Sequence, residues 1–315
     1  MNRNRFSVFI CVALILVLSF ASCSIYGTLD DLRAEAARKN HIGKKSIIEM
    51  VYVPAGSFDL GLELNPSVGG DNGYDPVTNV TMSGFYMGKF QVTQAQYQAV
   101  MGTNPSYFTT SPEGNQGKLP VEQVSWYNAI VFCNRLSKME GLTPAYTIDE
   151  MTDPDEWIST YGTPPTDWIA DSRWNYAGIV DSSTGYRLPT EAQWEYAAKG
   201  GDGSPGSFTY SGSNSVGDVA WYYDNSSSTH EVGKKLPNGL GIYDMSGNVW
   251  EWCWDWYVDY PGGLQTDYVG ASVGTNRVFR GGSWFRDAES ARSVYRFSYN
   301  PYYRSIDVGF RVSLP

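Results

Sequence analysis

Histidine, positive charge and long apolar runs are all scarce in this chain of 315 residues. The two histidines are His41 and His230, so none follows the G-x-S-x-G stretch at 270–274 to complete a nucleophilic triad in the usual chain order. The 33 Asp and Glu outnumber the 23 Lys and Arg, which gives a formal net charge of −10. Such a surface on average repels a phosphate backbone, so the composition argues against a nucleic-acid partner.

One long apolar run occurs, and it lies at the N-terminus. Residues 6–20 follow two arginines and are too short and too early for a membrane-spanning helix, so they are typical of a secretory signal. The run ends in small residues before Cys23, which resembles a bacterial lipobox. We expect a signal peptide over 1–22, an acylated Cys23, and a lipid anchor in the bacterial cell envelope, at its outer surface. The alternative is an ordinary signal cleaved near Ala21, with Cys23 incidental.

Two cysteines, Cys133 and Cys253, would remain in the mature chain after Cys23. An export compartment permits disulfides. Cys133 belongs to an apolar stripe at helical spacing with Ala129 and Ile130, which predicts a buried side chain. Neither cysteine has a neighbouring base that would make it a nucleophile. The sequence leaves open whether the two pair.

The rest of the composition indicates a loop-rich α+β domain. Hydrophobic residues make up 42% and aromatics 15%, enough for a large core, and 33 Gly with 16 Pro indicate many turns. Residues 23–48 are polar and predict a linker, and 49–315 predict the globular domain. We expect strands over 49–58, 85–92, 277–280 and 308–312, and helices over 94–101, 125–140 and from 190 to about 200.

Five motifs occur in order along the domain. They are Met50-Val-Tyr-Val-Pro-Ala-Gly-Ser57, Val92-Thr-Gln94, Pro120-Val-Glu-Gln-Val-Ser-Trp126, Gly185-Tyr-Arg-Leu-Pro-Thr-Glu-Ala-Gln-Trp-Glu-Tyr196 and Gly241-Ile-Tyr-Asp-Met-Ser-Gly-Asn-Val-Trp-Glu-Trp252. Over 49–314 the chain resembles the formylglycine-generating-enzyme-like (sulfatase-modifying factor) family. That resemblance implies an α+β, C-type-lectin-like fold of the formylglycine-generating-enzyme subtype. Residues 149–181 are longer than the family leads us to expect, and their tryptophans predict a surface insertion that packs against the domain.

The C-terminal region, 277–314, separates into a frame and intervening positions. The frame consists of 277–284, Ala288, Arg292, Ser293, Arg296, Asn300, Pro301, Arg304 and 308–312. It resembles the end of the same family and, more closely, the variable region of proteins diversified by retroelements. That resemblance implies thirteen diversified, ligand-binding positions: Phe285, Arg286, Asp287, Ser290, Tyr295, Phe297, Ser298, Tyr299, Tyr302, Tyr303, Ser305, Ile306 and Asp307. All are residue types that an AAC codon yields when both adenines are replaced freely, and Lys, Gln, Met and Trp, which such codons cannot encode, are absent from them.

The composition of the thirteen positions favours a binding surface. Tyrosine offers large, stiff contact area while Ser and Asp supply adaptable hydrogen bonds, and Tyr and Arg are frequent binding hot spots. We expect most of these side chains to be exposed and to bind a protein or cell-surface component whose identity the residues do not give. The alternative is that the aromatics pack the core.

The resemblance also implies chemistry that these residues do not supply. A formylglycine-generating enzyme needs a cysteine pair at places that fall near Arg286 and Ala291, yet no cysteine follows Cys253. A related iron-dependent branch needs several histidines, which are missing. We therefore expect a non-enzymatic protein that requires no cofactor. Asp244 and Glu251 resemble a calcium site of the family, although they could instead cap turns and pair with arginines.

Two other functions stay open at this point. The chain could be an enzyme or enzyme accessory of the same superfamily that uses an unrecognised site, or an envelope structural protein. The sugar-binding motif of true lectins does not occur, so a lectin-like fold does not imply sugar binding here.

Overall fold

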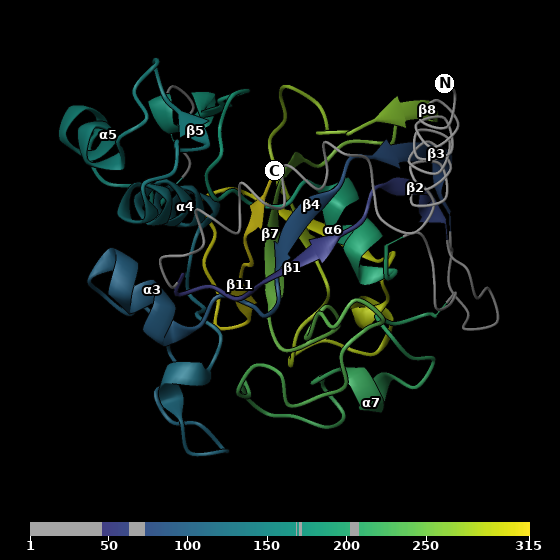
Figure 1. Ribbon diagram of the computed structural model, residues 1–315. Coiled ribbons are helices and arrows are strands. Elements are labelled where there is room, and N and C mark those ends of the chain that lie inside the picture. Colours follow the sequence, from purple (N-terminus) through teal and green to yellow (C-terminus); the bar gives the residue numbers. More distant parts are fainter. Residues whose placement is uncertain (1–45, 63–72, 168, 170–171, 202–207) are drawn as a thin grey trace, which may run out of the picture. The chain divides into compact units, whose positions relative to one another are not determined.

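The computed structural model describes residues 46–62, 73–167, 169, 172–201 and 208–315 (Figure 1). The expected signal peptide, Cys23 and nearly all of the linker lie outside the described residues. Residues from Ile47 to Pro315 cluster as one unit by their internal contacts. Within the described part, no helix has both the length and the apolar character needed to cross a membrane.

Three of the helices that the sequence predicts begin at capping boxes. Their N-caps are Thr93, Ser125 and Thr190, and each side chain accepts a hydrogen bond from the backbone N–H three residues later. The helices are α3 (Gln94–Met101), α4 (Trp126–Glu140) and α6 (Glu191–Ala198). Gly141 ends α4 in the left-handed conformation, with φ of 77°. Short helical segments are η2 (Gln116–Lys118), α5 (Pro154–Tyr161), η3 (Arg173–Tyr176), α7 (Val216–Val219) and η4 (Glu289–Ala291).

Strand β7 (Trp250–Trp256) lies in a four-stranded sheet of order β10-β9-β7-β11, completed by β10 (Arg296–Tyr299), β9 (Arg277–Arg280) and β11 (Val308–Gly309). Alternation along a strand sends its four tryptophans to one face and Glu251, Cys253 and Asp255 to the other. Accordingly, Trp250, Trp252 and Trp254 join one core cluster and Cys253 joins another. The expected strand over 308–312 is shorter, because the chain leaves β7 after Gly309 and crosses to β4.

The remaining strands form three small sheets. The expected strand over 49–58 is divided into β1 (Met50–Val53) and β2 (Gly56–Leu62), because the Pro54-Ala55 turn separates them. Strand β4 (Phe85–Gly88) pairs with β1 and with β12 (Ser313–Leu314). Strand β2 pairs with β3 (Gly73–Met82), which also pairs with β8 (Gly263–Thr266), and β5 (Tyr146–Thr147) pairs with β6 (Gly178–Ile179).

The insertion at 149–181 packs against the domain, as its tryptophans predicted. Trp157 and Trp174 are buried in the core cluster that includes Trp126, and the ring centroid of Trp174 lies 5.9 Å from that of Tyr127 on α4. Trp157 also donates a hydrogen bond from Nε1 to the Met151 carbonyl at 2.9 Å. Cys133 and Cys253 are both buried and unpaired, in different core clusters, which answers the question that the sequence left open.

Candidate ligand-binding surface

The thirteen predicted variable residues differ in how far the fold exposes them. Ser290 and Asp307 are buried, which corrects the expectation for these two positions. Five side chains are exposed, namely Phe285, Arg286, Asp287, Phe297 and Tyr299. Six are half-buried, namely Tyr295, Ser298, Tyr302, Tyr303, Ser305 and Ile306.

The frame residues between them are mostly buried. All of 277–284 and 308–312 is buried, and so are Arg292, Ser293 and Arg296, whereas Arg304 is exposed. The chain therefore alternates between side chains that hold the fold and side chains that face outward.

Two buried arginines of the frame attach this segment to α6. Arg280 pairs with Glu195, and its Nη1 donates to the carbonyls of Val294 and Tyr295 at 2.8 and 2.7 Å. Arg296 donates from Nε and Nη2 to the two carboxylate oxygens of Glu191, at 2.9 and 2.6 Å. Burial alone would lower the pKa of each guanidinium, but the adjacent carboxylates outweigh it, and the pKa of both arginines rises. The backbone of the segment is thereby fixed from beneath.

An aromatic patch lies on β10 and the turn that follows it. Phe297 and Tyr299 are 41% and 40% exposed, and Phe297 stacks on Trp250 with ring centroids 6.0 Å apart. Tyr299 stacks on Tyr303 at 3.8 Å. The expected exposure of Tyr295, Tyr302 and Tyr303 is wrong in part, because all three pack against the core cluster that includes Trp250. Only the two β10 aromatics of this patch are exposed rings.

Phe285 belongs to a second aromatic group, which sequence analysis of the C-terminal region missed. Its ring is 53% exposed and lies 5.2 Å from the buried Trp284 and 6.5 Å from Tyr223, which is 63% exposed. Phe108 makes a T-shaped contact with Trp284 at 5.4 Å and carries the exposed Tyr107 beside it. The sequence signal that could have found this group is the pair of adjacent aromatic residues at 107–108, in a turn-rich loop. Loops far away in sequence thus extend the surface.

The two buried members of the predicted set stabilise turns instead of facing a ligand. The Asp307 carboxylate accepts hydrogen bonds from Ser283 Oγ at 3.0 Å and Ser305 Oγ at 2.5 Å. Ser290 donates from both its backbone N–H and its Oγ to Asp287 Oδ1, at 3.0 and 2.9 Å. Both residues were predicted to be variable from the frame pattern, and that pattern does not show which residues a side chain contacts in the fold.

Glu122 is a further residue that the sequence did not single out. It is fully buried, its Oε1 accepts the Phe108 N–H at 2.9 Å, and its Oε2 has no hydrogen-bond partner. Burial raises the pKa of Glu122 to about 7, and the charge of Asp307 adds to that rise. An ionisable group therefore lies beneath the loop that carries Tyr107 and Phe108.

The residues expected to bind calcium have other partners. The Glu251 carboxylate accepts hydrogen bonds from Arg311 Nε at 2.6 Å and Nη2 at 2.8 Å, and one more from Trp194 Nε1 at 2.7 Å. Asp244 accepts the Gly233 N–H at 2.8 Å, and burial raises its pKa to about 6. No group of three or more His, Cys, Asp or Glu in the described ranges is placed to hold a metal ion. Arg311 supplies positive charge beside Glu251, which fits the alternative that this carboxylate pairs with an arginine, and the calcium site stays a prediction.

The sulfatase-modifying factor enzyme 1-like domain family matches residues 36–314. The chain belongs to this family. Its α+β, C-type-lectin-like fold of the formylglycine-generating-enzyme subtype is thereby confirmed. The match covers the helices and the sheets that support the surface. The surface is therefore part of the family domain.

Proteins similar to this chain have different names. The chaperone protein LppX of Paenibacillus barcinonensis is 40% identical over 253 residues, covering 74% of this chain and 81% of that protein. The formylglycine-generating enzyme of Thermomonospora curvata is 29% identical over 276 residues, covering 78% and 86%. Among solved structures, Treponema denticola variable protein 1 matches with a TM-score of 0.73 and 38% identity, covering 84% of this chain and 94% of that one.

Proposed function

We propose that the protein binds a ligand through the surface formed by Phe285, Phe297, Tyr299, Tyr107 and Tyr223, and that a retroelement diversifies its C-terminal positions. The observation that carries this proposal is the division of 277–314 into a buried frame and outward-facing intervening residues. A surface that changes by mutation needs such a scaffold, because a buried substitution costs stability whereas an exposed one rarely does. The similarity to a protein named as variable supports the same conclusion.

The proposed ligand is a protein or another cell-surface component. The surface is aromatic, and its hollow beside Trp250, Phe297 and Tyr299 measures only about 20 Å³, which suits a macromolecular partner better than an enclosed small molecule. Exposed Arg286 and Asp287 supply charged groups at its edge. Exposed tyrosine and phenylalanine with neighbouring serine is a composition that binding surfaces favour.

The proposal includes the absence of formylglycine-generating activity. The positions near Arg286 and Ala291, where the family resemblance implies a cysteine pair, carry no thiol in this sequence. Arg286 instead has a side chain 45% exposed on the proposed surface. The same region of the fold would therefore serve binding in place of oxidation.

We place the protein in the bacterial cell envelope, anchored by acyl chains on Cys23. The support is the apolar run at 6–20 and the small residues before Cys23. An anchor of this kind, followed by a polar linker, would hold the aromatic surface away from the membrane.

A matched pair of variants tests the binding surface. Phe285, Phe297 and Tyr299 are changed together to Ser, and the control changes three exposed apolar residues elsewhere, Met139, Leu236 and Leu264, to Ser. Binding to whole host cells and to immobilised matrix extracts is measured by flow cytometry and surface plasmon resonance. We expect the first variant to lose binding and the control to keep it. Equal binding by both variants would place the ligand elsewhere.

The gene tests diversification independently of binding. Codons ending in C with variable first and second positions should occur at the outward-facing residues, with an adenine-rich near-copy of the region and a reverse transcriptase gene nearby. A gene neighbourhood without the near-copy and the reverse transcriptase would contradict diversification and leave the binding test unaffected.

A further inference from the structure

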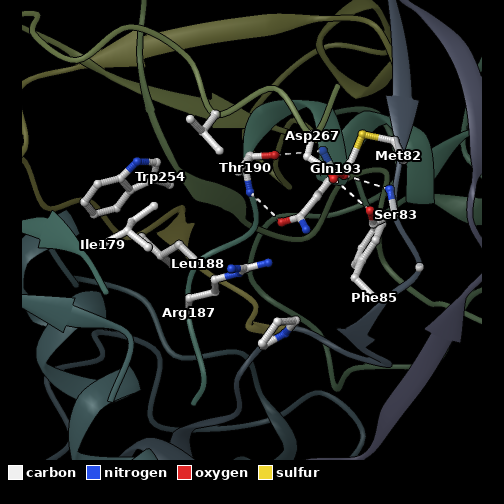
Figure 2. A pocket seen from close by; sticks show the side chains of 13 residues that line it. Met82, Ser83, Phe85, Ile179, Arg187, Leu188, Thr190, Gln193, Trp254 and Asp267 are labelled. Carbon is white, nitrogen blue, oxygen red and sulfur yellow. Dashed lines mark hydrogen bonds between the residues drawn. The ribbon is translucent and has the colours of Figure 1, made fainter. Parts of the chain in front are cut away.

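A cleft lies beside β6 of the insertion and the loop at 267–274. It has two adjoining compartments, of about 300 and 550 Å³, which share Ile179, Trp254 and Val269. Figure 2 shows the smaller compartment, with Trp254 and Ile179 on one side and Ser83 with Asp267 on the other. None of the thirteen predicted variable residues lines either compartment. The cleft is therefore separate from the proposed binding surface.

Arg277 lines the larger compartment with an incompletely paired cationic side chain. The residue is 1% exposed, and its guanidinium carbon lies 3.4 Å from the ring centroid of Trp256 and 3.8 Å from that of Trp126. Its Nη1 donates to the Trp254 carbonyl, whereas its Nε has no hydrogen-bond partner. Across the described residues, no carboxylate lies within ion-pair distance of Arg277. A buried cation held only by aromatic faces and one carbonyl is a ready partner for an anion.

The charges around the cleft favour an anion. Burial lowers the pKa of Arg277 to about 9, so it stays cationic at neutral pH. Asp255, whose charge acts on Arg277, lies on the opposite face of β7, and burial raises its pKa to about 7, so it offsets that cation only in part. Arg187 is a second cation in the lining, and the acidic Asp267 already accepts two hydrogen bonds from Ser83. Among the described residues that line the larger compartment, Arg277 is the charged one, in a chain of net charge −10.

The lining of the larger compartment is mostly aromatic and aliphatic. The loop at 270–274 can lie close to β7 because a Cβ on Gly274 would stand 2.6 Å from Trp256 Cβ, and one on Gly270 2.8 Å from Asp255 Oδ1. At the mouth, Tyr176 is 62% exposed and Val273 76% exposed. A bare inorganic anion would leave this apolar surface uncovered, whereas a ring would bury it.

We propose that the cleft binds a small organic anion, a carboxylate carried on a flat apolar ring, with the carboxylate at Arg277 and the ring against Trp256 and Tyr176. A guanidinium suits a carboxylate because its planar N–H groups match the two oxygens. This site does not depend on the proposed ligand-binding surface.

Three related probes separate the contributions of charge and ring. Isothermal titration calorimetry of the full chain is carried out with phenylacetate, with the uncharged phenylacetamide and with the ring-less acetate. We expect phenylacetate to bind at least about ten-fold more tightly than either, since about 1.4 kcal/mol of charge or ring contact amounts to that factor. Phenylacetamide binding as tightly as phenylacetate, or no phenylacetate binding in the millimolar range, would overturn the proposal.

Charge changes at the mouth locate the bound probe without disturbing Arg277. Val273→Asp adds a negative charge at the mouth, and Leu264→Asp adds the same charge on β8, outside the lining, at a residue that is 84% exposed. We expect phenylacetate affinity to fall about three-fold or more in Val273→Asp, to rise in Val273→Lys and to stay unchanged in Leu264→Asp, as expected for charge placed near a bound ion. Equal effects of the two Asp variants would place the probe elsewhere. Phe297→Ser with Tyr299→Ser should leave the affinity unchanged, and a loss would place the probe on the other surface.

Discussion

Arg296 and Glu191 form a bidentate ion pair in which their side chains are 3% and 2% exposed. The pair joins β10 to the first residue of α6. On either side of Arg296 in sequence, Tyr295 and Phe297 belong to the predicted variable set. The ion pair therefore determines where these neighbours emerge, whatever their identity.

Removing one partner of this pair should destabilise the fold. Arg296→Met leaves Glu191 buried with the Tyr260 hydroxyl and the more distant Arg280 as partners, so we expect a loss of about 3 kcal/mol in the free energy of unfolding. Adding Glu191→Leu should restore much of it, because the uncompensated buried charge is gone. Phe297→Ser should change the stability by less than about 1 kcal/mol. Urea titrations of the four proteins measure these values, and equal losses for Arg296→Met and Phe297→Ser would contradict the division into frame and surface.

Stability should fall as pH rises through neutrality, and Glu122 should account for part of the fall. Its pKa is raised on folding from 4.5 to about 7, so its contribution to stability is complete at acidic pH and is lost as the carboxyl ionises. We expect Glu122→Gln to be more stable than the wild type by about 2 kcal/mol at about pH 8 and nearly equal to it at about pH 5. Burial also raises the pKa values of Asp244 and Asp255. The stability of the variant should therefore still fall with pH, but with a smaller slope.

Thermal melts at several pH values test this dependence. Asp153→Asn, at an exposed ion pair with Lys138, is the control, because the pKa of Asp153 is lowered by that lysine and its stabilising effect is lost only in acid. If Glu122→Gln follows the wild-type curve throughout, the carboxyl ionises as freely in the folded chain as in the unfolded one.

The protein should not convert cysteine to formylglycine. A sulfatase-type peptide is incubated with the protein, with and without copper, and examined by mass spectrometry. A formylglycine-generating enzyme acting on the same peptide serves as the positive control. We expect no turnover above the blank, because no cysteine follows Cys253 and both Cys133 and Cys253 are buried. Any reproducible product would reveal a catalytic group outside the family pattern.

The mature protein should carry acyl chains on Cys23. When expressed with its leader in a bacterial host, it should incorporate labelled fatty acid. It should also partition into the detergent phase, because the acyl chains insert into the apolar interior of the micelles. Cys23→Ala should abolish both properties. Cys133→Ala is the control, since that cysteine is buried within α4. A Cys23→Ala protein that still takes up label would show that the anchor is attached elsewhere.

Local sequence signals predicted the helices well and the strand ends less well. The boxes at Thr93 and Thr190 define helix starts through contacts within four residues, so no distant partner is needed. The end of a strand, by contrast, depends on where the neighbouring strand that it pairs with ends. The extended run from Val308 therefore divides between β7 and β4, a division that depends on where those strands lie.

The sequence by itself determined the family, the helices and the frame around the variable positions. Only the tertiary structure decided that Arg311, distant in sequence, forms an ion pair with Glu251, and that Asp307 and Ser290 are buried. The tertiary structure also brought Tyr107 and Tyr223 into the same aromatic group as Phe285, and it placed Arg277 in the lining of a cleft. The physical reason is that periodicity and caps depend on neighbours along the chain, whereas burial and ion pairing depend on which elements pack together.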